Sequence, residues 1–163
     1  VMGWGILLST CVCVYLMVQR FSRMLKELRI SIRYTCGVIL PAFMVTTLSV
    51  QQLPWLLILQ FAFTAFLNLL VFSWFDAAND TADGATSFAT VVGQKKTLWF
   101  VWLLFGSVCF ITLFIQQRES ILLNIVAVIQ VLLPVFRNYV EANDRYRIIG
   151  DAAFTLPVLL FLS

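Results

Sequence analysis

The sequence predicts an all-α protein that crosses a membrane several times as a helical bundle. Hydrophobic residues make up 61% of its 163 residues, whereas soluble domains contain about 45–50%. Charged residues account for only 12%, and the apolar residues gather into six long runs. Because a spanning helix needs about 20 mainly apolar residues, we expect six spanning helices that form a single transmembrane domain over residues 1–163.

The six predicted spans follow one another with short polar connections. They are Val1–Gln19, Tyr34–Val50, Trp55–Phe75, Leu98–Gln116, Ile121–Phe136 and Ile148–Ser163. The first run has neither a basic region nor a small-residue cleavage site, so we interpret it as a span and not as a signal peptide. Pro41 and Pro134 lie inside predicted spans, where neighbouring groups tolerate a kink. Because the sequence opens inside an apolar run, we expect it to be part of a longer chain.

Basic residues lie almost entirely in three of the five predicted loops. These loops contain Arg20, Arg23, Lys26, Arg29 and Arg33, then Lys95 and Lys96, then Arg137, Arg145 and Arg147. Of the eleven basic residues, only Arg118 lies on the other side. The positive-inside rule makes the three basic loops cytoplasmic, and we expect an integral protein of a bacterial inner membrane. Ordinary topology is our preferred explanation for the run 20–33, ahead of contact with anionic lipid or a diphosphate.

The chain contains no histidine and four cysteines. The lack of histidine excludes His-based catalysis and His metal ligands. All four cysteines, Cys11, Cys13, Cys36 and Cys109, lie in apolar runs, where a thiol behaves as a small packing group. The sequence therefore predicts neither a disulfide framework nor a zinc site, and we expect no nucleic-acid partner.

The third loop, residues 76–97, holds the densest set of acidic residues. Asp76, Asp80 and Asp83 follow the third apolar run at spacings i, i+4 and i+7, which place them on one helical face. Carboxylates this close repel one another unless water, a base or a metal offsets their charge. Mg²⁺ suits such a site, because it is a hard cation that takes a few carboxylate oxygens together with phosphate oxygens.

The same loop contains signals for how the chain continues. We expect the third helix to extend beyond the bilayer to Asp83 and to end at Gly84. Ser87–Val92 is mildly amphipathic and is predicted to form a short interfacial helix that covers a site at the membrane surface like a lid. Near the end of the sequence, Asp151 is predicted to begin and cap the last helix. Arg147 is its expected partner, because an acid near a membrane needs one.

The loop resembles the second aspartate-rich motif of the UbiA family of intramembrane prenyltransferases. The matching residues are Asp76, Asp80, Gly84, Ser87, Gly93, Gln94 and Lys95, with Ser87 where threonine is more usual. The fold that this resemblance implies is a bundle of nine spanning helices, with aspartate-rich motifs after the second and sixth helices. Three predicted spans precede the motif here and three follow it. The resemblance therefore implies helices four to nine of that fold, with the first motif outside this sequence.

The resemblance implies an enzyme that transfers a polyprenyl group from a prenyl diphosphate to a lipophilic acceptor, such as an aromatic ring, with Mg²⁺ as cofactor. Asp76 and Asp80 would be its catalytic and metal-binding residues, and Asp83 would be a further metal ligand. Lys95 and Lys96 would contact the substrate, unless they serve topology alone. Asn68 lies two turns before Asp76 on the same face, and it is either a substrate contact or an interhelical hydrogen-bonding group.

Three other functions share features with this sequence. A CDP-alcohol phosphotransferase also uses an Asp-rich site at the membrane edge, but Ser87-Phe88 stands where that family has Ala-Arg, and its downstream aspartates are missing, so we reject it. A six-helix transporter or scaffold subunit would have no catalytic role, although few ionisable residues lie in the spans to form a transport path. A degenerate family member is the third alternative. If the mature chain were this short, half the metal site would be missing and we would expect no activity.

Overall fold

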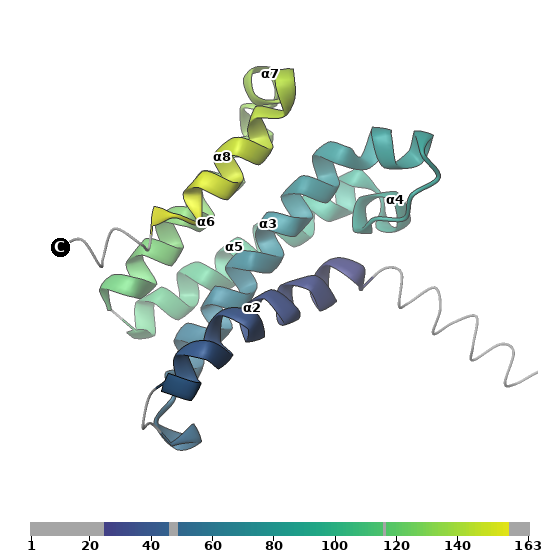
Figure 1. The fold of residues 1–163 in the computed structure, drawn as a ribbon. Coiled ribbons are helices and arrows are strands. Elements are labelled where there is room, and N and C mark those ends of the chain that lie inside the picture. Colours follow the sequence, from purple (N-terminus) through teal and green to yellow (C-terminus); the bar gives the residue numbers. More distant parts are fainter. Residues whose placement is uncertain (1–24, 46–48, 116, 157–163) are drawn as a thin grey trace, which may run out of the picture.

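The computed structural model describes residues 25–45, 49–115 and 117–156, and every regular element in these ranges is helical. The elements are α2 (Lys26–Val45), η1 (Val50–Gln52), α3 (Trp55–Ala82), α4 (Phe88–Val92), α5 (Gln94–Ile115), α6 (Arg118–Val135), α7 (Arg137–Val140), η2 (Ala142–Asp144) and α8 (Arg145–Ala153). The predicted all-α class is therefore confirmed. The longest helix, α3, runs through the centre of the molecule, between α2 and α8 (Figure 1).

Three helices in the described ranges are long and apolar enough to cross a membrane. They are α3, α5 and α6, and they correspond to the predicted third, fourth and fifth spans. Each begins at or before the predicted first residue, because polar residues next to an apolar run continue the helix. Pro41 and Pro134 both lie inside helices, as predicted.

The structure does not support six spans. The first predicted span, Val1–Gln19, lies outside the described residues. The second corresponds to α2, which is not among the three candidates. It begins at Lys26, and its first half contains Glu27, Arg29 and Arg33 as well. These charged residues lie before Tyr34, where the predicted span begins. The first half of α2 is therefore more polar than the predicted span.

The sixth predicted span, Ile148–Ser163, is not a spanning helix in the part that is described. α8 has nine residues and ends at Ala153, so it rises about 14 Å, less than half of the roughly 30 Å hydrocarbon core. Residues 157–163 lie outside the described ranges. Asp151 therefore lies within α8 and does not begin it, which corrects the predicted cap. The start is set earlier, where Asn143 and Asp144 adopt left-handed backbone conformations.

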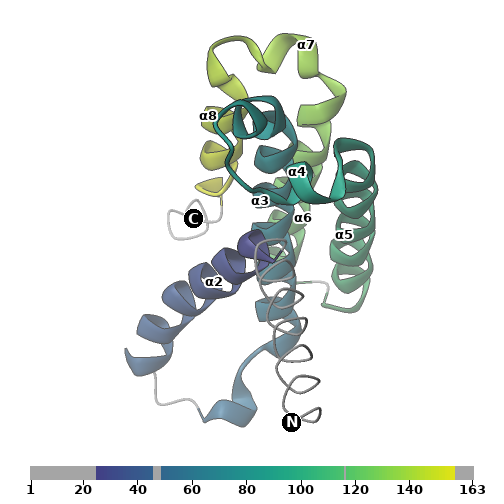
Figure 2. The same cartoon turned by 90° about the vertical axis from the view of Figure 1, so that its right-hand side faces the viewer.

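The core lies where α3 packs against α5 and α6, and α4 and α8 pack against the end of α3 that carries the Asp-rich segment. Its buried side chains include Leu67, Leu70, Val71, Phe75, Phe88, Val101, Leu104, Val131, Leu133 and Tyr146. Figure 2 shows α5 and α2 on opposite sides of α3. A polar link joins the three long helices, because the Gln60 amide donates to Thr112 Oγ1 and to the Ser120 carbonyl, at 3.0 Å each. Hydrogen bonds of this kind hold helices together in a bilayer.

The end of α3 follows the sequence prediction closely. The helix has 28 residues and continues through the Asp-rich segment to Ala82. Gly84 then has a φ of +66°, and the Ala85 N–H donates to the Asp80 carbonyl at 2.7 Å, a hydrogen-bond pattern that ends helices at glycine. The predicted short helix is α4, and Gly93 separates it from α5. These turns bring the Asp-rich segment beside α4 and the start of α5.

Candidate functional site

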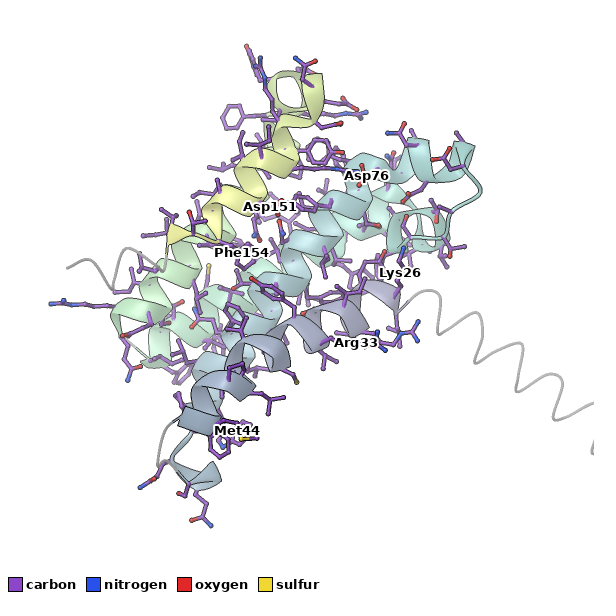
Figure 3. All side chains as sticks on the ribbon, viewed as in Figure 1. Lys26, Arg33, Met44, Asp76, Asp151 and Phe154 are labelled. Atoms are coloured by element: carbon purple, nitrogen blue, oxygen red, sulfur yellow. The ribbon has the colours of Figure 1, made fainter. Side chains whose placement is uncertain are left out.

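Asp76 lies on α3 and is held by two side chains from α8. Its Oδ1 accepts hydrogen bonds from the Tyr146 hydroxyl at 2.5 Å and from Arg147 Nη2 at 2.8 Å. This ion pair corrects the prediction that Arg147 pairs with Asp151. Both contacts use Oδ1, so Oδ2 keeps its lone pairs for another group. The contact places α8 over the predicted cytoplasmic end of α3, where Figure 3 labels Asp76.

The electrostatics of this contact keep the Arg147 guanidinium charged and the Tyr146 hydroxyl protonated. Hydrogen bonds from Arg147 to Asp76 and Tyr146 raise the pKa of Arg147 above its usual value. Burial, followed by the hydrogen bond to Asp76, raises the pKa of Tyr146 to about 12. Tyr146 therefore stays a neutral donor at any physiological pH. The arrangement orients one oxygen of Asp76, and no side chain of the described residues donates a hydrogen bond to the second.

Asp80 and Asp83 continue along the same side of α3, in increasingly open positions. Asp80 is half-buried, whereas Asp83 is exposed and lies just past the last helical residue. Among residues 25–45, 49–115 and 117–156, no three acidic or cysteine side chains gather closely enough to hold a metal ion. Mg²⁺ requires only one or two protein carboxylates beside phosphate and water. The donor set of Asp76 and Asp80, one turn apart, fits that requirement, and Asp83 is the more distant candidate.

Glu27 was not predicted as a site residue, yet it is buried beside the Asp-rich segment. It is only 5% exposed, and its Oε1 accepts the Phe88 N–H at 2.8 Å, at the start of α4. Burial raises the pKa of Glu27, the hydrogen bond from Phe88 opposes this rise, and the negative charge of Asp80 adds to it. One sequence signal pointed to it, because Glu27 is the only acidic residue before Asp76.

α4 is fastened to two long helices and covers the Asp-rich end of α3 from one side. Its first N–H bonds to Glu27 of α2, and the Ala89 N–H donates to Ser73 Oγ of α3 at 2.9 Å. The Ser87 N–H is satisfied locally by Thr90 Oγ1 at 2.8 Å. The segment predicted as a lid is therefore held closed by side-chain acceptors from its neighbours, one of them an ionisable carboxyl.

Lys95 and Lys96 are exposed in the first turn of α5. Gln94 beside them donates to the Trp74 carbonyl at 3.2 Å, so the start of α5 lies next to the last apolar turn of α3. Two lysines at a helix N-terminus place cations at the positive end of the helix dipole, an arrangement that an anion relieves. The structure thus brings both lysines to the same end of the bundle as Asp76 and Asp80.

A cavity of about 410 Å³ lies between α2, α3 and α8. Its walls are formed by Ile30, Tyr34, Ala65, Asn68, Leu69, Phe72, Asp151, Phe154 and Thr155. Asn68 is 8% exposed, and its Oδ1 is buried without a hydrogen-bond partner in the described part of the chain. The alternative prediction, an interhelical hydrogen bond, is therefore not formed by this oxygen. The cavity lies one to two turns along α3 from Asp76, on the membrane side.

Close packing and aromatic rings define the edges of this cavity. α8 crosses α3 at Gly150, where a Cβ atom would lie 2.7 Å from Phe72 Cε1 and 3.0 Å from Asn68 Oδ1. Tyr34 stacks on Phe61 with ring centroids 5.8 Å apart, and Phe154 meets both rings edge-on. The rings of Tyr34, Phe61 and Phe154 therefore gather at one edge of the cavity, and Phe72 lies at the crossing with α8. No protein-family model, characterised protein or solved structure matches this chain.

Proposed function

We propose that this chain is part of a UbiA-like prenyltransferase, which transfers a polyprenyl group from a prenyl diphosphate to a lipophilic acceptor in the membrane. The observation that carries the proposal is the position of Asp76 and Asp80. Asp80 follows Asp76 by one turn at the polar end of α3. A mainly apolar cavity lies one to two turns before Asp76 on the same helix. A substrate with an anionic head and an apolar tail matches this order of polar and apolar surfaces.

Each proposed site residue has a chemical role that its surroundings support. Asp76 and Asp80 would hold Mg²⁺, with Asp83 as a further ligand, and the bound ion would neutralise the departing diphosphate. Lys95 and Lys96 would bind diphosphate oxygens at the N-terminus of α5. Tyr146 and Arg147 fix the Asp76 carboxylate through Oδ1. The cavity at Asn68 would accommodate the prenyl tail and exclude water, which would otherwise quench a cationic intermediate.

The contact between Asp76 and Arg147 also supports a second candidate, a non-catalytic relative in which the Asp-rich segment is structural. Asp76 already forms a hydrogen-bonded ion pair with Arg147, and a carboxylate used in this way joins α3 to α8 without any ligand. In that case Asp76 would matter for folding and not for binding. The two candidates differ in whether the Asp80 carboxylate is needed, because this side chain makes no hydrogen bond or ion pair with the described residues.

Equilibrium binding of a polyprenyl diphosphate, with and without Mg²⁺, tests the proposal. The protein would be compared with Asp76→Asn and Asp80→Asn, which keep side-chain shape but remove charge. Asp144→Asn is the matched control, because Asp144 is exposed, outside the site, and in a left-handed conformation that asparagine tolerates. We expect Mg²⁺-dependent binding that falls at least about tenfold in both site variants, or roughly 1.4 kcal/mol, and is unchanged in the control. Binding that ignores Mg²⁺ or both substitutions would contradict the proposal.

A further inference from the structure

One acidic residue lines the cavity without a side-chain partner in the described part of the chain. Asp151 is the single charged side chain among the described cavity walls, and its carboxylate forms no hydrogen bond or ion pair with the described residues. The nearest cation on its own helix, one turn earlier, is Arg147, which is engaged by Asp76. Figure 3 shows Asp151 and Phe154 along the edge of α8 that faces α3. The carboxylate therefore lines the cavity, and no cation among the described residues pairs with it.

Asp151 is exposed on the molecule, but its level along α3 places it beside an apolar segment. α8 runs antiparallel to α3, because Arg147 pairs with Asp76 while Gly150 packs on Phe72. Asp151 thus lies level with the segment from Asn68 to Phe72, about 6–12 Å along α3 from Asp76 at 1.5 Å per residue. That segment belongs to the apolar part of a candidate membrane span. An acidic side chain at such a depth pairs with an opposite charge or marks a ligand site.

The remaining cavity walls favour a cation as the missing partner. Three of them are aromatic, Tyr34, Phe72 and Phe154, and the faces of aromatic rings attract organic cations. The buried Asn68 Oδ1 is an unpaired acceptor next to them. The other walls are the aliphatic side chains of Ile30, Ala65 and Leu69, together with Thr155. An inorganic cation would not contact these apolar walls, whereas a cation that carries an alkyl tail would contact both the carboxylate and the apolar walls.

We propose that the cavity between α2, α3 and α8 binds a lipophilic organic cation, an ammonium head on an apolar tail. The head lies against the Asp151 carboxylate and the rings of Tyr34, Phe72 and Phe154, and the tail extends along the aliphatic walls. The volume of about 410 Å³ lies within the usual range of small-molecule sites, about 300–1,000 Å³. Binding of the cation requires neither Mg²⁺ nor a diphosphate, but the cation and the proposed prenyl tail would occupy the same cavity and would compete for it.

The test compares two probes that differ in charge but share a tail. The full chain, in nanodiscs of neutral lipid with EDTA present, is titrated calorimetrically with dodecyltrimethylammonium or with dodecanol, and titrations of empty nanodiscs are subtracted. We expect the ammonium probe to bind at least about tenfold more tightly than the alcohol, or roughly 1.4 kcal/mol. Asp151→Asn should remove that preference, and Asp144→Asn, an exposed carboxylate outside the cavity, should keep it.

A second variant covers the case in which Asp151→Asn does not fold, as judged by near-ultraviolet circular dichroism. Phe154→Leu keeps apolar volume but removes one ring face, and it should weaken the ammonium probe about threefold while leaving dodecanol unchanged. Equal binding of the two probes to the unmodified chain, no binding of either, or an unaltered preference in a folded Asp151→Asn variant overturns the proposal. In a Phe154→Leu protein, equal losses for both probes do the same. Because EDTA is present throughout, these results do not depend on the diphosphate experiment.

Discussion

At the scale of single residues, the hydroxyl of Tyr146 should contribute measurably to stability through Asp76. Tyr146→Phe keeps the ring, which stacks on Phe75 with centroids 4.3 Å apart, and removes the hydrogen bond to the carboxylate together with the longer one that the hydroxyl accepts from Arg147 Nε at 3.2 Å. Hydrogen bonds to charged groups contribute about 1.5–3 kcal/mol, so we expect the free energy of unfolding to fall by that amount. Thermal unfolding in detergent measures it. Tyr139→Phe is the control, because Tyr139 is 75% exposed, and an equal loss in both variants would contradict the assignment.

Glu27 should make stability depend on pH in a defined direction. Its pKa is raised from the usual 4.5, chiefly by burial, so the folded protein binds this proton more tightly than the unfolded chain. The contribution of Glu27 to the free energy of unfolding is therefore fully present below pH 4.5 and is lost as the pH rises through the raised pKa. Glu27→Gln retains an acceptor for the Phe88 N–H and removes the ionisation.

The measurement is the Tm of Glu27→Gln and of the unmodified protein between pH 4 and pH 8. We expect the Tm of the variant, relative to the unmodified protein, to increase as the pH rises across this range. The corresponding change at an exposed carboxylate, Glu119→Gln in the first turn of α6, serves as the control. A difference in Tm that stays constant with pH would mean that the Glu27 carboxyl is not buried against α4.

How far these residues could be predicted depends on the distance between partners along the chain. The spacing of Asp76, Asp80 and Asp83 is visible in sequence because one helix carries all three. The partner of Asp76 was missed because Arg147 lies 71 residues away, whereas Asp151 offered an obvious i, i+4 partner on the same helix. The role of Glu27 was missed for the same reason, since it is 61 residues from the Phe88 N–H.

At the scale of helices, the crossing of α3 and α8 should be sensitive to a single methyl group. Gly150→Ala adds a Cβ that would lie 2.7 Å from Phe72 Cε1. Overpacking costs about 1–3 kcal/mol, more than the roughly 1 kcal/mol that alanine gains over glycine in a helix. We therefore expect Gly150→Ala to lower the free energy of unfolding by about 1 kcal/mol, as measured by chemical denaturation in detergent.

A second glycine provides a control with the opposite expected sign. Gly106 lies inside α5, and nothing lies within 4 Å of an added Cβ. Gly106→Ala should therefore stabilise the protein by up to about 1 kcal/mol through helix propensity alone. If Gly150→Ala stabilised the protein as much as Gly106→Ala does, α8 would not pack closely on α3, and the cavity between them would lose one of its walls.

The helices that the sequence predicted well are those whose apolar runs have the length of a bilayer. α3, α5 and α6 were found because hydrophobicity alone sets their position. α2 and α8 were placed less well, since both combine charged and apolar residues, and their ends depend on tertiary contacts such as Arg147 with Asp76. α4 was predicted because Gly84 and Gly93 bound it on either side, and both have positive φ.

At the scale of the whole molecule, helix length and charge together predict one orientation. The 28 residues of α3 span about 42 Å, about 12 Å more than the hydrocarbon core. That excess matches the turns from Asp76 to Ala82, so the apolar part of α3 fills the bilayer and the Asp-rich segment lies outside it. Lys95 and Lys96 begin α5 on the same side, which the positive-inside rule makes cytoplasmic.

Cysteine labelling tests this orientation. In a background without the four native cysteines, Asp83→Cys reports on the end of α3 and Glu119→Cys reports on the start of α6, with the 22-residue α5 between them. Because α5 spans about 33 Å, a membrane-impermeant maleimide added to right-side-out vesicles should label Glu119→Cys at once and Asp83→Cys only after permeabilisation. The reverse order would mean that the protein has the opposite orientation in the membrane. Asp76 and Asp80 would then lie on the outside, where a cytoplasmic diphosphate could not reach them. Labelling of both from one side would mean that α5 does not cross the bilayer.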